Sequence, residues 1–337
     1  FENGQRSFHI EGVAAAGSIT QTLKNGEACL EVMTGSVLPI NSDTVIRYED
    51  LSIENGVATI NVDTLKFQQN VHFKGEDRKA GDKIIEKNRI IASPEIGVLA
   101  TVGMDQVKVA IPPKIAIIST GDELVEINEQ PLPHQIRKSN VHRLKSSLQQ
   151  MGFTADSFHL NDNKEEIKST LSYIITKYQV VMLSGGVSKG KFDYIPSAME
   201  ELGVKKLFHK IAQRPGKPFW FGRKNDTVFF ALPGNPVSSF LNMTYYFKNW
   251  YFWSLDVKVK KQYAKLSKEI SFKPDLTYFA QVQLEFDETG QLWATPNEGH
   301  GSGDLANLTD ADAFIILPRG RTNFEKGTCF EILKFRK

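Results

Sequence analysis

Three short glycine-containing segments of the sequence have the composition of phosphate-binding turns. They are residues 119–124 (STGDEL), 184–194 (SGGVSKGKFDY) and 232–239 (LPGNPVSS). Glycines allow backbone N–H groups to turn toward an anion, and a following helix adds partial positive charge. One such segment alone is more simply an ordinary strand-to-helix turn. Three together favour a phosphate or pyrophosphate pocket. The groups expected to line it are Gly121, Ser184, Gly185, Gly186, Ser188, Gly234 and Asn235.

Carboxylates accompany these segments. Asp122 and Glu123 follow the first apolar run, Asp162 follows another, and Asp193 lies in the second glycine segment. Mg²⁺ in phosphate sites takes one or two carboxylates together with phosphate oxygens and water. The pattern therefore predicts a magnesium site with Asp122, Glu123 and Asp193 as ligands. The alternative for Asp122 and Asp162 is that each caps the N-terminus of a helix.

A cluster of cations lies in residues 209–222 (HKIAQRPGKPFWFG). Lys210, Arg214 and Lys217 surround a Pro-Gly turn that precedes an aromatic strand. An arginine can hold an oxyanion with two donors, and a lysine supplies a point charge. The segment therefore predicts an anion-binding loop, although on its own a solvated basic loop explains it better.

Three further residues lie in short polar segments outside this region: Thr34 in MTGS, Asp77 in GEDRKAG and Ser302 in NEGHGSGDL. Local sequence alone assigns none of them a role. The sequence contains no nucleophile elbow, no Walker lysine motif and no G-x-G-x-x-G fingerprint.

The elements that must position these residues alternate between strand and helix over residues 111–257. Such alternation predicts a parallel sheet covered by helices on both faces. Ligands of open α/β sheets bind outside the carboxyl ends of the strands, where all three glycine segments are expected to lie.

The flanking regions are predicted to be β-rich. Residues 1–76 form an N-terminal β domain with tight turns at its Asn-Gly pairs. Residues 77–110 form part of a mixed linker domain, with a short helix capped by Ser93. Residues 258–337 form a C-terminal β domain of the sandwich or barrel type, with a hairpin turn at residues 287–290. The expected fold class is therefore α/β plus β.

Composition excludes several classes of protein. A net charge of +2 argues against a general nucleic-acid binder. The two cysteines form no pair motif, which fits a reducing compartment and predicts a cytoplasmic protein. No apolar run is typical of a membrane span, and the aromatic stretch at residues 243–253 is interrupted by Lys248 and Asn249. It is predicted to be a buried or interface helix.

Taken in order, seven motifs resemble those of the molybdopterin molybdotransferase family, which includes bacterial molybdenum-cofactor synthesis proteins and the C-terminal domain of gephyrin. They are MTGSVLP, GEDRKAG, IAIISTGDEL, SGGVSKGKFDY, RPGKPFWFG, LPGNPVSS and GHGSGDL. The resemblance implies an elongated homodimer with a three-layer α/β/α molybdopterin-binding domain between an N-terminal β domain and a C-terminal β-barrel-like domain. It also implies insertion of molybdate into adenylated molybdopterin, release of AMP and a requirement for Mg²⁺.

The same resemblance implies roles for particular residues. The implied catalytic residues are Thr34, Asp77, Glu123, Asp162 and Asp193. Thr34 and Asp77 would face the active site from the partner subunit. Lys210, Arg214 and Lys217 would line the anion side. Pro233 and Pro236 would shape the loop beneath the pterin, and Ser302 would approach it from the last domain.

Four departures from the family pattern alter the expected cleft. Lys191 and Lys138 stand where relatives often carry an acid, and Gln281 stands where an arginine is expected. An Asp-Gly motif of the family would lie before Phe1. These departures keep open a catalytically weakened paralogue or scaffold that binds pterin or nucleotide without turnover. An enzyme of the nicotinamide-nucleotide amidase type is disfavoured by the β domains on both sides.

Overall fold

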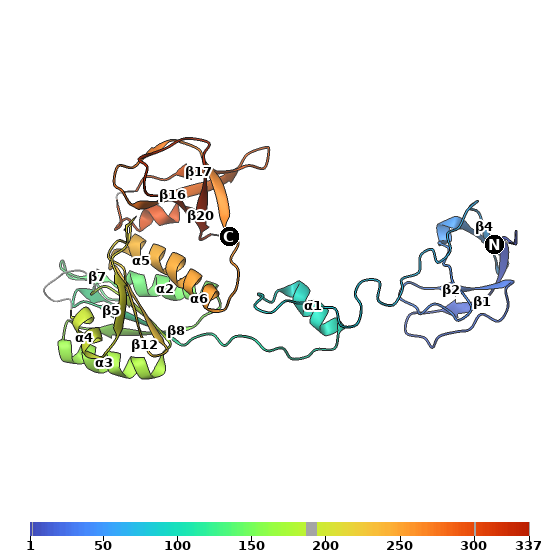
Figure 1. Cartoon of the computed structure of the whole chain (residues 1–337), viewed down its shortest axis with the longest axis horizontal. Helices are drawn as coiled ribbons and strands as arrows, with labels where there is room; N and C mark the ends of the chain where they lie inside the picture. The colour runs from blue at the N-terminus through green and yellow to red at the C-terminus, as the bar shows by residue number, and fades with distance from the viewer. Residues whose placement is uncertain (2, 187–193, 300, 337) are drawn as a thin grey trace. The chain divides into compact units, whose positions relative to one another are not determined.

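The computed structural model describes residues 1, 3–186, 194–299 and 301–336 (Figure 1). The chain divides into two compact units, Phe1–Glu86 and Lys87–Lys337. In the part of the chain that the structure describes, no helix combines the length and apolar character needed to cross a membrane.

The first unit is built on a four-stranded sheet with the strand order β2-β1-β4-β3. The strands are β1 (Ser7–Ala14), β2 (Ala28–Val32), β3 (Leu51–Glu54) and β4 (Val57–Ile60), with a 3₁₀ turn at Tyr48–Asp50 before β3. β1 pairs with β2 in parallel and with β4 antiparallel. The Asn55-Gly56 pair closes the β3–β4 hairpin with both residues at positive φ, as its sequence predicts.

The second unit begins with α1 (Ser93–Thr101). The predicted cap is Ser93, but the structure places Ala92 at the N-cap position and Ser93 inside the helix. The reason is Glu95, whose carboxylate accepts a hydrogen bond from the Ala92 backbone N–H at 2.9 Å and pairs with Arg89 at 2.7 Å. The contact with Ala92 satisfies a donor that the helix itself leaves unpaired.

A six-stranded sheet with the order β10-β12-β13-β9-β5-β8 forms the centre of the α/β domain. Its strands are β5 (Ile115–Thr120), β8 (Ala155–Leu160), β9 (Val180–Ser184), β10 (Lys205–His209), β12 (Trp220–Lys224) and β13 (Thr227–Leu232). The parallel pairing predicted from sequence is confirmed for β13, β9, β5 and β8. β12 instead runs antiparallel to β13, because a tight turn at Asn225 joins the two strands. β10 then pairs antiparallel with β12 at the edge of the sheet.

Helices cover both faces of this sheet (Figure 1). They are α2 (Ser139–Gln150), α3 (Lys164–Lys177), α4 (Ile195–Glu201), α5 (Pro236–Asn242) and α6 (Lys248–Ser254), with a π-helical turn at Met243–Phe247 between the last two. Successive strand residues point to opposite faces. Ala116 and Ile118 therefore pack in the core beneath α3 and α4, whereas Ile115 and Ile117 pack in the core beneath α2.

The C-terminal region is a closed five-stranded barrel. Its strands are β14 (Gln262–Leu266), β16 (Thr277–Phe286), β17 (Leu292–Pro296), β18 (Ala313–Leu317) and β20 (Cys329–Lys334), and a β16–β18 pairing closes the ring. A smaller pair, β15 (Ile270–Ser271) and β19 (Asn323–Phe324), and a 3₁₀ turn at Ala306–Thr309 accompany it. A two-residue strand of the α/β domain, β11 (Gln213–Arg214), pairs in parallel with β16.

The β16–β17 hairpin turns at Asp287, as predicted, and its carboxylate organises the turn. Asp287 accepts hydrogen bonds from the Thr289 hydroxyl at 2.6 Å, the Thr289 and Gln291 backbone N–H groups at 2.9 and 3.0 Å, and the Trp293 indole at 2.7 Å. These bonds, first that from the Thr289 hydroxyl, lower the pKa of Asp287 from 3.8 to about 2.

Replacing Asp287 with asparagine is therefore expected to lower the thermal stability of the barrel at neutral pH. A group with a depressed folded-state pKa stabilises the fold fully above its unfolded pKa and loses that contribution as pH falls through the folded value. The Tm difference between Asp287→Asn and wild type should be largest above about pH 4 and shrink toward pH 2. Melting curves across this range test the prediction, with Glu288→Gln in the same turn as the control. A Tm difference that does not change with pH contradicts it.

Candidate active site at the strand ends of the α/β domain

The second glycine segment begins at the end of β9 in a conformation that requires glycine. Gly185 and Gly186 have φ of 99° and 67°. A Cβ on Gly186 would lie 2.8 Å from Thr120 Oγ1 and 2.9 Å from Ile195 Cγ1. The backbone of this loop therefore packs directly against β5 and the start of α4. The predicted residues Ser188 and Asp193, together with Lys191, lie outside the described residues.

The second and third glycine segments are joined by Asn140, in the first turn of α2. Its Nδ2 donates to Ser184 Oγ at 3.0 Å and to the Gly234 carbonyl at 2.7 Å. The first contact ties the end of β9 to α2, and the second ties down the loop after β13. The structure thus brings together Ser184 and Gly234, as the predicted convergence of strand ends requires.

Arg143 adds a second set of contacts, which links α2 to α5. Its guanidinium donates to the Pro236 carbonyl, to Asn140 Oδ1 at 2.9 Å and to Ser239 Oγ at 2.6 Å, and it lies 5.4 Å from the centre of the Phe240 ring. Burial lowers the pKa of Arg143 to about 10, so the charge is held in a desolvated position by neutral acceptors.

The first glycine segment leads into a strand, so the alternative that Asp122 caps the N-terminus of a helix is wrong. The chain continues from Gly121 into β6 (Leu124–Val125), which pairs with β7 (Ile136–Arg137). Gly121 has a φ of 125°, and a Cβ placed on it would lie 2.3 Å from Glu123 Oε2. The Glu123 carboxylate therefore folds back over Gly121 at the end of β5.

Asp122 and Asp162 are brought together at this edge of the sheet. Asp122 Oδ1 accepts a hydrogen bond from the Asp162 backbone N–H at 3.0 Å. The alternative that Asp162 caps α3 is wrong, because Asn163 is the N-cap and accepts from the N–H groups of Glu165 and Glu166. Among the described residues no group of three or more His, Cys, Asp or Glu side chains could hold a metal. The predicted magnesium ligand set includes Asp193, outside those residues, and it stays a prediction.

Lys138 has a partner that local sequence patterns do not predict. Its Nζ lies 2.6 Å from Glu126 Oε1, and only 10% of the Lys138 side chain is exposed. The hydrogen bond from Lys138 lowers the pKa of Glu126. The β6–β7 pairing creates this contact, because Val125 accepts a hydrogen bond from the Lys138 backbone N–H. The positive charge at position 138 is therefore neutralised by the chain itself.

The predicted anion loop presents its cations to solvent and buries the residues between them. Lys210, Arg214 and Lys217 are exposed, whereas Gln213 and Gly216 are buried. Lys210 has a φ of 70°, an uncommon backbone conformation for a residue with a Cβ. Its N–H donates to the Phe219 carbonyl at 2.8 Å, which holds the start of the loop against the segment that enters β12.

The barrel contributes Ser302 to the same region. Ser302 Oγ accepts from Asn235 Nδ2 at 2.8 Å, and its carbonyl accepts from the Val237 N–H at 3.1 Å. The third glycine segment, at Pro233–Pro236 along the chain, therefore contacts α2 on one side and a barrel loop on the other. Gln281 lies on β16, and its Oε1 is buried with no hydrogen-bond partner in the described part of the chain.

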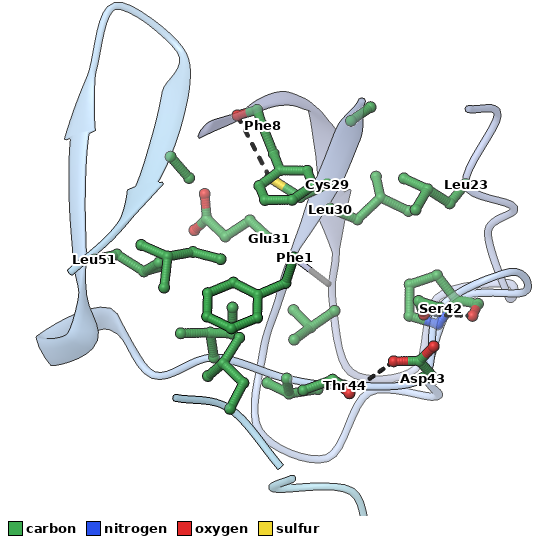
Figure 2. Close-up of a pocket in the computed structure, with 18 of the residues that line it drawn as sticks. Phe1, Phe8, Leu23, Cys29, Leu30, Glu31, Ser42, Asp43, Thr44 and Leu51 are labelled. Carbon is green, nitrogen blue, oxygen red and sulfur yellow. Dashed lines mark hydrogen bonds between the residues drawn. The ribbon is translucent and has the colours of Figure 1, made fainter. Parts of the chain in front are cut away.

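The two remaining predicted residues, Thr34 and Asp77, belong to the unit Phe1–Glu86. Thr34 is one of the residues that line a cavity of about 760 Å³ beside the N-terminal sheet. Figure 2 shows this cavity, with Glu31 and Thr44 among the labelled lining residues. Asp77 is exposed, and its Oδ2 lies 3.3 Å from His72 Nε2. His72 Nδ1 lies 3.4 Å from the Glu76 carboxylate, so the imidazole bridges the two acids of the GED motif.

Three family models match successive parts of the chain. They are the MoeA N-terminal region (domain I and II) over residues 2–103, the probable molybdopterin binding domain over 116–249 and the MoeA C-terminal region (domain IV) over 263–335. A molybdopterin molybdenumtransferase from Synechocystis sp. is 40% identical over 334 residues, which is 98% of this chain and 83% of that protein. The chain belongs to the molybdopterin molybdenumtransferase family.

More distant members and solved structures agree. The molybdopterin molybdenumtransferase of Bacillus subtilis is 28% identical over 98% of this chain and 78% of its own length. Two solved molybdopterin biosynthesis moeA structures from Pyrococcus horikoshii cover 98% of this chain, with TM-scores of 0.78 at 29% identity and 0.82 at 24% identity. The chain covers 82% of the first of these structures and 81% of the second. The likeness to the second, at 24% identity, supports the fold alone. The predicted family and fold class are therefore confirmed.

Sequence reasoning missed two residues of this site, Asn140 and Arg143. Their spacing of three places both side chains on one face of the first turn of α2. Two polar side chains on that face, directly after a short strand, were a usable signal for a contact with neighbouring strand ends. Their hydrogen-bond partners outside α2 are 44 to 96 residues away in sequence, which local patterns do not reveal.

Proposed function

We propose that this chain is a molybdopterin molybdotransferase that inserts molybdate into adenylated molybdopterin and releases AMP. The supporting observation is the bracket formed by Asn140, which joins the glycine loop at Ser184 to the loop at Gly234. Asn140 thereby holds the ends of β9 and β13 together. Exposed carboxylates follow the end of the neighbouring strand β5, and the barrel loop at Ser302 contacts the loop after β13. Membership of a family whose curated relatives are named for this transfer gives the arrangement its chemistry.

The proposed roles are those that the chemistry of each group allows. The Gly185 N–H already donates a hydrogen bond to the Leu232 carbonyl at 3.2 Å. The Gly186 N–H is therefore the group proposed to bind the phosphate of the pterin. Arg214 and Lys217 would offset the remaining negative charge. Release of AMP breaks one P–O bond while the oxygen of a water molecule forms another. The proton of that water must pass to an acceptor, and Glu123 at the end of β5 is the proposed one.

Mg²⁺ is part of the proposal. Asp122 and Glu123 are adjacent exposed carboxylates, and carboxylate oxygens are the ligands that Mg²⁺ prefers. With Asp193 they would hold the ion, which when bound would neutralise phosphate charge. Glu123 would use one carboxylate oxygen for the ion and the other to accept the proton. The hydrogen bond from the Asp162 N–H engages Oδ1 of Asp122, so Oδ2 is the atom proposed for this purpose.

A homodimer and a cytoplasmic location complete the proposal. Several large apolar side chains around α1 are exposed in the single chain, among them Ile96 at 56%, Val102 at 53% and Met104 at 50%. Large apolar side chains exposed close together along one segment support a subunit interface there. Cys29 and Cys329 are both free, as is usual in a reducing compartment.

The test is AMP release from adenylated molybdopterin in the presence of molybdate and Mg²⁺. Wild type should release AMP only with both, and Glu123→Gln should lower kcat by about 100-fold, because a proton acceptor typically contributes that much or more. Glu129→Gln, an exposed glutamate in the loop after β6, is the control and should be unaffected. Release that does not depend on molybdate, or a fully active Glu123→Gln, would overturn the assignment.

The weakened paralogue is the less favoured alternative. Its support is the change of charge at Lys138, Lys191 and Gln281. Lys138 is engaged by Glu126 and nearly buried, so its charge is not presented to a ligand. Lys191 lies outside the described residues.

A further inference from the structure

A buried network of polar side chains lies beneath the cationic loop. Gln213 and Asn242 are 2% and 0% exposed, and they contact each other through Gln213 Nε2 and Asn242 Oδ1 at 2.8 Å. Gln213 lies in the loop, and Asn242 is the last residue of α5. Buried amides are costly unless they are hydrogen-bonded, so this pair must serve the loop or the fold around it.

Both amides are oriented by backbone carbonyls of the loop. Gln213 Nε2 also donates to the Pro215 carbonyl at 2.8 Å, and Asn242 Nδ2 donates to the Gly216 carbonyl at 3.1 Å. Only an N–H₂ group can donate to a carbonyl, so neither amide can be flipped. Pro215 and Gly216, the two residues between Arg214 and Lys217, therefore each accept a hydrogen bond from a buried amide.

Tyr246 closes the network from the π-helical turn that comes after α5. Its hydroxyl donates to Gln213 Oε1, which would otherwise be a buried acceptor without a donor. Extra residues in a helical turn of this kind are often found at functional sites. The neighbouring Thr244 Oγ1 is also buried but has no hydrogen-bond partner among the described residues. Thr244 is therefore not a member of the network.

The network leaves the loop little freedom to adjust. Gly216 has a φ of 87°, and a Cβ placed on it would lie 2.6 Å from Asn242 Oδ1. On its other edge the loop pairs with the barrel, where Gln213 and Arg214 are in register with Thr277 and Tyr278. The backbone pairing with β16 and the hydrogen bonds from the buried amides together fix the Cα positions of Arg214 and Lys217.

We propose that Gln213, Asn242 and Tyr246 are positioning residues that set Arg214 and Lys217 for the phosphate-bearing substrate. The proposal rests on the proposed function and deepens it by assigning residues that do not touch the substrate. Arginine and lysine side chains are flexible, so their value in binding depends on where their backbone is anchored. A displacement of about 1 Å can lower catalytic efficiency by as much as 100-fold.

The experiment uses two substitutions that preserve shape. Tyr246→Phe removes only the hydroxyl that donates to Gln213, and Asn242→Asp replaces the donor facing the Gly216 carbonyl with an oxygen. Thr244→Val in the same turn is the matched control, because it removes a buried hydroxyl that takes no part in the network. Thermal unfolding first establishes that each variant is folded.

Two readouts separate positioning from general damage. In the AMP-release assay, Tyr246→Phe and Asn242→Asp should raise KM for adenylated molybdopterin by about tenfold with kcat nearly unchanged. In a Lys217→Ala, Arg214→Ala background, Tyr246→Phe should have little further effect on KM, because it acts through those cations. Hydrogen exchange of residues 210–219 should be faster in both variants than in wild type and Thr244→Val.

The outcomes separate failure of the positioning claim from failure of the proposed function. If Lys217→Ala with Arg214→Ala raises KM but Tyr246→Phe and Asn242→Asp do not, the network does not position the cations and the proposal fails. If the effects of Tyr246→Phe and the cation substitutions simply add, the proposal also fails. If wild type releases no AMP, the proposed function fails. Hydrogen exchange then decides the positioning claim, which unchanged exchange in residues 210–219 would overturn.

Discussion

Replacing Phe230 with alanine is expected to lower the free energy of unfolding by about 3–5 kcal/mol, because the large ring leaves a cavity that the sheet cannot close. Phe230 lies on β13 and is 1% exposed. Its ring centre is 4.9 Å from that of Phe221, 5.5 Å from Trp250 and 5.7 Å from Phe247. The substitution thus removes contacts with β12, the π-helical turn and α6 together.

Chemical denaturation monitored by tryptophan fluorescence measures this loss, since Trp250 is in contact with the ring. Phe286→Ala is the matched control. Phe286 ends β16 with 67% of its surface exposed, and its replacement should change stability by no more than about 0.5 kcal/mol. Equal losses for both variants would show that the aromatic cluster does not hold the α/β domain together.

Gly186→Ala is expected to lower kcat/KM for AMP release by about 100-fold while leaving the protein folded. Gly186 has a φ of 67°, and an added Cβ would meet Thr120 Oγ1 at 2.8 Å and Ile195 Cγ1 at 2.9 Å. Both neighbours are anchored in β5 and α4, so the glycine loop must move. The proposed phosphate cradle moves with it.

The control for Gly186→Ala separates strain from displacement. Gly203 has a similar φ of 74°, but a Cβ there would meet no atom within 4 Å. Gly203→Ala therefore introduces the same unfavourable backbone conformation, about 1–2 kcal/mol, without moving a neighbour. It should reduce stability and preserve AMP release. Full activity in Gly186→Ala would remove this loop from the proposed site.

The sequence predicted the glycine loops because their signals are local. An apolar run followed by glycines marks a strand end, and the common direction of parallel strands brings such ends together. Ser184 and Gly234 do converge for this reason, within reach of one side chain of α2. The family motifs added residues such as Ser302, whose contact with Asn235 joins the barrel to the α/β domain.

Other features were beyond local patterns. The strand β12 follows the same alternation of apolar segments as the parallel strands along the chain, and the tight turn at Asn225 makes it run antiparallel to β13. Lys138 and Glu126 are brought together by a strand pair of two residues each, too short to give a periodic signal. The network around Asn242 joins residues 26 to 29 positions apart through buried amides, which composition alone does not distinguish from ordinary polar residues.

The pairing of β11 with β16 has a consequence for how far the α/β domain and the barrel depend on each other. The hydrogen-bonded edge of the anion loop, the Ser302 contact and the packing of Phe240 on Phe314 and Phe335 all cross from the α/β domain to the barrel. A gene fusion that transferred residues 111–257 alone would leave these surfaces bare. Separating the α/β domain from the barrel is therefore expected to destabilise both.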